Sequence, residues 1–171
     1  HWARASTAPM RMFKGFSSDG GLKVPAIISY PGKLEARAGT FTNQLTTVLD
    51  LPATFLDIAK TTHPGTSYKG RQVHPYTGVS LLPLLNGESE IIHEPDDVVG
   101  WELNNSRAVR KGDWKIILLP GRFGTGDWEL FNIKNDPAER TDLSEAEPEK
   151  RSEMIAEWEK YARNNGVIIA E

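Results

Sequence analysis

Lys14 is the residue whose type and surroundings offer the clearest chemistry. It stands in a loop that leads into a double glycine, Gly20 and Gly21. Two glycines in a row let the backbone take positive φ, or approach another group closely, so they can hold a nearby side chain in place. A single lysine is nevertheless most often a surface residue. The residue pattern by itself therefore gives Lys14 no defined role.

Other side chains that could do chemistry show no pattern of a site. The chain has no cysteine, which excludes disulfides, thiolate metal ligands and a cysteine nucleophile. Asp96 and Asp97 could bind a hard cation, although two adjacent loop acids are usually exposed. The histidines share no ligand spacing, and we expect them in solvated loops: His1, His63, His74 and His93. We therefore expect no metal site within this chain.

The segment that follows Lys14 predicts a buried strand over residues 24–30. This run is rich in β-branched residues and ends at Pro31 and Gly32. A buried strand needs neighbours on both edges, and the residues before it cannot supply them. We therefore expect residues 24–30 to lack order or to pair with a second copy of the chain.

Two helices are predicted between this strand and residue 90. The first lies within residues 45–59, where Asp50 is a good N-cap. The second is a short apolar helix over 81–85, with Ser80 as its cap and Gly87 as its end. Loops separate the two helices.

The last eighty residues predict a small antiparallel sheet covered by a helix. Four candidate strands, joined by short links that favour a meander, lie at 98–103, 107–110, 114–119 and 129–132. A helix begins near Pro148 and ends at Gly166. Its apolar stripe should lie on the sheet: Met154, Ile155, Trp158, Tyr161 and Ala162. We expect residues 1–90 to be the incomplete end of an α/β domain and 91–171 to be an α+β subdomain.

Several short blocks, in order along the chain, resemble type I sulfatases of the alkaline phosphatase superfamily, arylsulfatases above all. The blocks are 14–16, 19–25, 30–32, 50–59, 78–87, 107–115 and 129–139. Asp19 stands where the family usually has Glu, and Lys23 where Arg is common. The resemblance implies the C-terminal portion of an alkaline phosphatase/sulfatase-like α/β fold, with a four-stranded antiparallel sheet and a C-terminal helix.

The resemblance also implies hydrolysis of sulfate esters, from an aryl sulfate or a sulfated sugar, to alcohol and inorganic sulfate. The lysine that matches Lys14 contacts the sulfate oxygens in that family. The family uses a formylglycine nucleophile and a bound Ca²⁺, whose motif and ligands lie upstream of the equivalent of His1. We therefore expect this chain to supply the sulfate-binding lysine, to bind neither cofactor alone and to be inactive without the missing N-terminal part.

Residues near the end of the first sheet strand are further candidates. Trp101, Glu102 and Asn104 could touch the leaving group, although loop and strand-end residues also have structural roles. Two alternatives stay open: a fragment of a phosphonate or phosphodiester hydrolase of the same superfamily, and a non-catalytic module for binding or oligomerisation.

Composition limits the partners. The net charge of −3, without a basic stripe, gives no case for nucleic acid, and no apolar run approaches the length of a membrane span. The expected partners are a small-molecule sulfate ester, the missing N-terminal part, and a second copy through residues 24–30. The start at His1 without methionine suggests processing or truncation, and the compartment, periplasmic, secreted or cytoplasmic, is left undecided.

Overall fold

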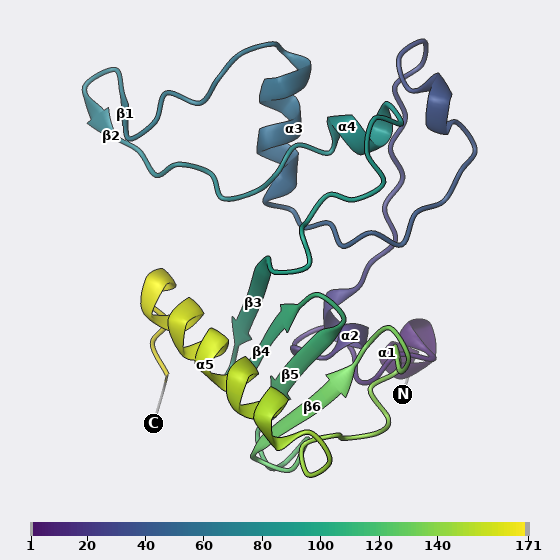
Figure 1. Ribbon diagram of the computed structural model, residues 1–171, viewed down its shortest axis with the longest axis vertical. Coiled ribbons are helices and arrows are strands. Elements are labelled where there is room, and N and C mark those ends of the chain that lie inside the picture. The colour runs from purple at the N-terminus through teal and green to yellow at the C-terminus, as the bar shows by residue number, and fades with distance from the viewer. Residues whose placement is uncertain (1, 170–171) are drawn as a thin grey trace. The chain divides into compact units, whose positions relative to one another are not determined.

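The computed structural model describes residues 2–169, which form two compact units (Figure 1). One unit joins the chain up to Pro25 with the chain from Pro95 onward, and we call it the sheet unit. The other spans Ala26–Glu94, and we call it the loop unit. The junction after Glu94 lies near the division expected at residue 90. The N-terminal segment, however, packs with the C-terminal sheet and not with residues 26–94.

The sheet unit contains the antiparallel meander that the sequence predicts. Its strands are β3 (Val98–Leu103), β4 (Ser106–Lys111), β5 (Trp114–Leu118) and β6 (Trp128–Asn132), and they pair in that order. Each strand pairs with the next in antiparallel register. The short links at 104–105 and 112–113 explain the first two pairings, because a tight turn returns the chain beside the strand it has just left. The longer link 119–127 joins β5 to β6.

Each face of this sheet is covered, so the unit has two cores. One face packs against the helix α5 (Pro148–Asn165) through Val109, Ile116, Leu130, Met154 and Trp158. The apolar stripe of this helix is therefore confirmed to lie on the sheet. Gly166 ends the helix in a left-handed conformation with φ of 62°, which glycine adopts without a steric penalty.

The opposite face of the sheet packs against the N-terminal segment. Ala108, Ile117, Leu119, Phe131 and Ile133 form this core. Met12, Phe16 and Trp101 pack against it. The segment contains two short helices, α1 (Trp2–Thr7) and α2 (Asp19–Leu22), with irregular chain between them. The loop that contains Lys14 is therefore part of the cover of a folded sheet.

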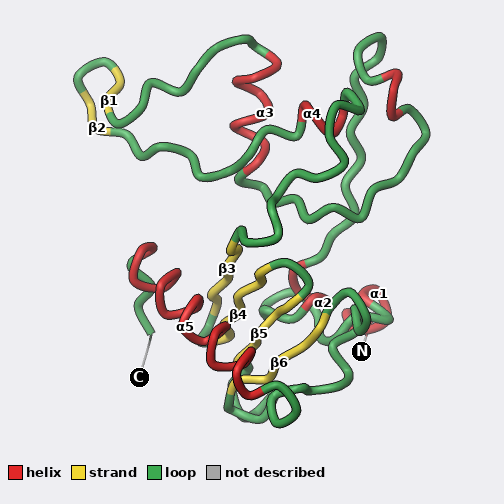
Figure 2. Tube along the Cα trace, in the orientation of Figure 1, coloured by secondary structure: helices red, strands yellow, loops and turns green. Residues whose placement is uncertain are grey.

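The loop unit has little regular structure (Figure 2). It contains a turn of 3-10 helix, η1 (Glu35–Arg37), the helices α3 (Asp50–Ile58) and α4 (Leu82–Leu85), and a small hairpin of β1 (Ser67–Tyr68) and β2 (Arg71–Gln72). Thr54 on α3 accepts a hydrogen bond from the backbone N–H of Leu81, at 2.9 Å, which joins the two helices. Asp50 is the first residue of α3 and not its cap.

Residues 24–30 do not form the predicted strand. Val24 is 81% exposed and Ile27 is 95% exposed. A strand exists only where its backbone is paired, and no other strand of the described residues lies beside this segment. The apolar, β-branched sequence indicates burial, but the described part of the chain provides nothing to bury it.

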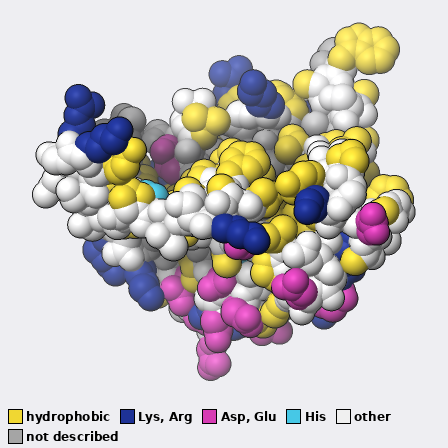
Figure 3. Space-filling model, turned by 90° about the horizontal axis from the view of Figure 1, so that it is seen from above, with side chains coloured by type: hydrophobic (Ala, Val, Ile, Leu, Met, Phe, Trp, Pro, Cys, Tyr) yellow, Lys and Arg dark blue, Asp and Glu magenta, His cyan; other side chains and the backbone are white. Residues whose placement is uncertain are grey.

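Hydrophobic side chains gather on the face seen in Figure 3. The most exposed large ones of the loop unit are Phe41, Ile27, Val48 and Phe55. Within residues 2–169, no helix combines the length and the apolar character needed to cross a membrane.

Candidate functional site

The loop that contains Lys14 is folded back on itself by the double glycine. A Cβ atom at Gly20 would lie 2.3 Å from the carbonyl oxygen of Arg11, and one at Gly21 would lie 2.1 Å from that of Phe16. Gly20 also donates a backbone hydrogen bond to Arg11, at 2.9 Å. Only glycine fits such close approaches. The reason for the two glycines is therefore space, and neither has positive φ.

The same loop is fixed to the sheet by buried polar contacts. The backbone N–H of Ser17 donates to the hydroxyl oxygen of Ser106 at the start of β4, at 2.8 Å. Arg11 binds both carboxylate oxygens of Glu129 on β6, at 3.2 and 2.9 Å. Both contacts come from one guanidinium nitrogen, Nη2, and this charge-assisted hydrogen bonding joins the loop to the strand. The residues on either side of Lys14 are thus fixed to separate strands.

A buried cluster of three charges, which we call the ion triad, lies beneath the loop. The Nζ atom of Lys115 on β5 lies 2.5 Å from Oδ1 of Asp19 and 2.8 Å from Oε1 of Glu139. The Lys115 residue is fully buried. The backbone N–H of Asp19 also donates to the Glu139 carboxylate, at 3.1 and 3.2 Å. Lys23 closes the cluster from the solvent side, 2.6 Å from Oδ2 of Asp19.

The two carboxylates of the ion triad differ in their acidity. Burial acts to raise the pKa of Asp19, but the charges and hydrogen bonds of Lys115 and Lys23 together outweigh it and hold that pKa below its usual value. Burial raises the pKa of Glu139, and the nearby Asp19 charge adds to this against the effect of Lys115. Lys115 thus has two carboxylate partners, of which Asp19 is the nearer.

Lys14 lies at a pocket of about 470 Å³ in the sheet unit. Its lining comprises the Lys14 loop, the edge strand β3 and one residue of α5: Lys14, Gly15, Phe16, Ser17, Gly21, Leu22, Gly100, Trp101, Glu102, Leu103 and Tyr161. Lys14 itself is exposed, and among residues 2–169 it forms no ion pair. The pocket therefore has one unpaired cation from the loop.

The structure brings three of the four expected site residues to this pocket. Trp101 and Glu102 line it together with Lys14. Asn104 is not among the lining residues and lies in the β3–β4 turn, where it and Asn105 have φ of 52° and 63°. Asparagine tolerates this left-handed conformation, so a turn role explains Asn104.

Tyr161 on α5 is a pocket residue that sequence reasoning did not select. A Cβ atom at Gly100 would lie 2.6 Å from the Tyr161 ring, so the glycine in β3 makes room for the aromatic side chain. Burial raises the pKa of Tyr161, and the Glu102 charge adds to this. A glycine inside an otherwise bulky strand signals such a close approach.

The ion triad was also missed at the sequence level, although Lys115 carries a signal. It is a charged residue in the middle of an apolar strand, flanked by Trp114 and Ile116. A lysine that points to a covered face needs a buried counter-ion. Its two partners cannot be located from local sequence, because they are 96 and 24 residues away.

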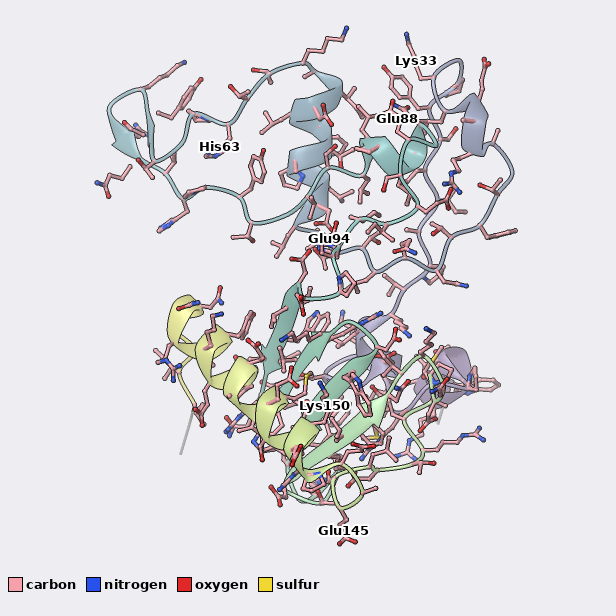
Figure 4. All side chains as sticks on the ribbon, in the orientation of Figure 1. Lys33, His63, Glu88, Glu94, Glu145 and Lys150 are labelled. Atoms are coloured by element: carbon pink, nitrogen blue, oxygen red, sulfur yellow. The ribbon has the colours of Figure 1, made fainter. Side chains whose placement is uncertain are left out.

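A second buried polar cluster belongs to the loop unit. The Asp50 carboxylate accepts from the backbone N–H groups of Thr47 and Val79, at 2.6 and 2.9 Å, and lies 3.1 Å from Nε2 of His93. The His93 side chain is only 12% exposed, so the expectation of a solvated histidine is wrong there. Figure 4 shows His63 on the chain between α3 and β1, where its ring meets the Tyr76 ring edge-on. His1 lies outside the described residues.

No group of three or more histidine, cysteine, aspartate or glutamate side chains that could hold a metal ion occurs in residues 2–169. The chain's own described residues thus do not fit a calcium centre. The sequence also contains neither a Cys-x-Pro-x-Arg nor a Ser-x-Pro-x-Arg motif from which a formylglycine could arise.

Comparison with solved structures identifies the class of fold. The protein Ps i-CgsB superimposes with a TM-score of 0.71 and 24% identity, over 91% of this chain and 32% of that chain. A structure from work on glycosaminoglycan metabolism by Bacteroides thetaiotaomicron gives a TM-score of 0.68 and 20% identity, over 89% of this chain and 32% of that one. The fold is that of the C-terminal portion of sulfatases, as expected from the sequence.

Sequence comparison gives the family. Residues 11–163 match the family described as N-sulphoglucosamine sulphohydrolase, C-terminal, and the chain belongs to this family. An uncharacterized sulfatase of Schizosaccharomyces pombe is 35% identical over 99% of this chain and 30% of its own length. A sulfatase of Formosa agariphila is 26% identical over 88% of this chain and 28% of its own length. The chain thus spans about 30% of the length of these relatives.

Proposed function

We propose that this chain is the C-terminal part of a sulfatase that hydrolyses sulfate esters to an alcohol and inorganic sulfate. The observation that carries the proposal is the pocket at Lys14. The unpaired ammonium group of this lysine lies on a fixed loop and lines the pocket together with Trp101 and Glu102. The family match includes all three residues. Both curated relatives are sulfatases by name, which supports the same chemistry.

In this proposal, Lys14 contacts the non-bridging oxygens of the sulfate group. Cleavage of the S–O bond moves negative charge onto the sulfate oxygens and the departing alcohol oxygen. A cation that is already in position stabilises that charge without further reorganisation. One such donor is worth about 2.7–4 kcal/mol in the transition state. Lysine suits this role because its ammonium group is a compact point charge.

Trp101 and Glu102 contact the alcohol half of the ester in this proposal. The Trp101 ring supplies an apolar wall, and it is already held in place by the core on its face of the sheet. The Glu102 carboxylate, exposed at the same pocket, can accept hydrogen bonds from hydroxyl groups. Asn104 lies beyond the pocket in the adjoining turn, so its contact requires a larger substrate.

The nucleophile and Ca²⁺ of the family would come from the rest of the protein. Ca²⁺ would neutralise sulfate charge, and formylglycine would supply the attacking oxygen. The described residues do not fit a metal centre, so the rest of the protein would have to hold both groups. The isolated chain is accordingly expected to be inactive.

An assay of the intact protein that contains this chain tests the proposal. We expect turnover of an aryl sulfate or a sulfated monosaccharide, and no turnover by the isolated 171 residues. Turnover of the matching aryl phosphonate monoester, with none of the sulfate, would favour the phosphonate hydrolase alternative. Inactivity of the intact protein on all three esters would contradict hydrolysis and leave a non-catalytic binding module.

A further inference from the structure

The ion triad is a costly arrangement for which packing gives no reason. Three charged groups are taken out of water beneath the Lys14 loop: Lys115, Asp19 and Glu139. Removing charges from water costs several kcal/mol per ion. A protein with hydrophobic residues of similar volume in their place is often equally stable. The neighbouring core residues on this face are apolar. The triad is therefore better explained by what it orients than by stability alone.

The geometry of the triad fixes the loop in more than one direction. Lys115 comes from the central strand β5, and Glu139 comes from the chain after β6. Asp19 contacts both, through its carboxylate and its backbone N–H group. A residue that is bonded through both side chain and backbone cannot rotate or slide without breaking contacts. Asp19 is thus the point at which the end of the loop is attached to the sheet.

The attachment reaches Lys14 through a short and stiff connection. Ser17, two residues before Asp19, is bonded to Ser106, and Gly20, one residue after it, is bonded to Arg11. Lys14 lies between Arg11 and Ser17, so the chain on both sides of it is held. The Lys115 ammonium also lies 5.8 Å from the centre of the Trp101 ring, which lines the same pocket.

We infer that Asp19, Lys115 and Glu139 are positioning residues that hold the Lys14 loop in the geometry needed at the pocket. This inference rests on the proposed role of Lys14 in sulfate ester hydrolysis. In this inference none of the three touches substrate, and each acts only by fixing the position of Lys14. Their removal should therefore lower kcat for the same reason that removing Lys14 lowers it.

A double-mutant cycle in the intact protein tests the inference. Asp19→Asn keeps the size of the side chain and removes its charge. We expect it to lower kcat at least about tenfold with KM nearly unchanged, because a 1 Å misplacement of a positioned group can cost roughly 100-fold. In the Lys14→Ala background, the same change should have no further effect on kcat, since the residue through which it acts is gone. Asp19→Glu, which keeps the charge, should restore most of the rate.

Two further measurements separate the outcomes. Hydrogen exchange of residues 11–23 should rise in Asp19→Asn and stay unchanged in Lys14→Ala. Glu153→Gln, which removes a lysine-bound carboxylate on the other face of the sheet, is the matched control and should leave both exchange and kcat as they are. Glu139→Gln provides the same comparison if Asp19→Asn does not fold.

Equal losses of kcat from Asp19→Asn with and without Lys14 would overturn the positioning role, as would exchange of residues 11–23 that does not change. If Lys14→Ala keeps full activity, the proposed role of Lys14 is wrong, and the exchange data still report whether the triad holds the loop. The two failures are thus distinguishable.

Discussion

The two units of the chain bury their hydrophobic side chains to very different extents. Among residues 2–169, ten of the buried hydrophobic residues belong to the sheet unit and three to the loop unit, although both units are rich in apolar residues. In the described part of the chain, twelve exposed large hydrophobic side chains belong to the loop unit, against six in the sheet unit. Exposed patches of this kind mark surfaces that meet a partner. The sheet unit has a buried core on each face of its sheet, while the loop unit leaves most of its large hydrophobic side chains exposed.

The polar interiors of the two units differ as well. The sheet unit buries a lysine between two carboxylates, whereas the loop unit buries one carboxylate, Asp50, among backbone donors and His93. The first arrangement joins distant parts of the chain, and the second joins the loops around α3. We therefore expect the stability of the sheet unit to depend on charge pairing, and that of the loop unit to depend on hydrogen bonding and pH.

The largest effect is expected from Lys115→Met, which leaves Glu139 buried without its cation and Asp19 with Lys23 alone. Breaking a buried pair of this kind costs about 3–5 kcal/mol. Denaturant unfolding followed by tryptophan fluorescence measures it, because four of the five tryptophans lie in strands or α5 of the sheet unit. Lys111→Met is the control, since Lys111 also meets two carboxylates, on the other face and closer to solvent. An equal loss in both variants would contradict a special role for burial.

A smaller effect is expected from Gly100→Ala, which places a methyl group against the Tyr161 ring. Forcing an atom into a packed site typically costs about 1–3 kcal/mol. The midpoint of thermal unfolding should fall. In the Tyr161→Ala background, Gly100→Ala should lower the midpoint by less than it does in the parent protein, because the ring that the methyl group meets is gone. Gly121→Ala, at a glycine with more room, is the control. If the two glycine variants unfold alike, the close approach of Tyr161 to β3 is wrong.

Acid should open the loop unit through Asp50. Burial acts to raise the pKa of Asp50, but hydrogen bonds from Val79, Thr47 and His93 outweigh it and hold that pKa below the usual 3.8. Because the folded pKa is lowered, the stabilisation is present above about pH 3.8, the unfolded value, and is lost as the pH falls through the folded value. Hydrogen exchange of residues 47–54 should therefore rise in that range. In Asp50→Asn this pH dependence should be absent, and its persistence would assign the acid sensitivity to another group.

The smallest effect on stability is expected from Ile27→Ser together with Phe41→Ser. Both side chains are almost fully exposed, and substitutions at such sites usually change stability by less than about 0.5 kcal/mol. The same change should reduce self-association of the isolated chain, measured by light scattering over a range of concentrations. A clean monomer before any substitution would contradict the idea that residues 24–30 recruit a second copy.

The parts of the fold that the sequence predicts well are those with local patterns. The four strands are short segments of neighbouring chain, and α5 has its stripe, its Pro148 start and its Gly166 end within one continuous segment. Residues 24–30 have an equally clear pattern, yet they form no strand. The strand prediction is wrong for the described chain, because a strand needs a paired neighbour and none of the described strands lies beside this segment.

The site was predictable only in part, for a similar reason. Lys14, Trp101 and Glu102 meet at one pocket, as a shared role would require, but their contact with substrate stays a prediction. Tyr161 and the ion triad come from segments far apart in sequence, and only the folded chain brings them to the Lys14 loop. Lys115 shows the limit: its place in an apolar strand signals a buried partner, but not which one.

The role of Lys14 is tested most directly by kcat/KM for a sulfate ester in the intact protein and in its Lys14→Ala variant. We expect a loss of roughly 100- to 1,000-fold, the effect of removing one donor to the charged oxygens of a transition state. The variant should keep the unfolding midpoint of the parent, because Lys14 is exposed and unpaired among the described residues. A folded Lys14→Ala protein with undiminished kcat/KM would contradict the role of this lysine in catalysis.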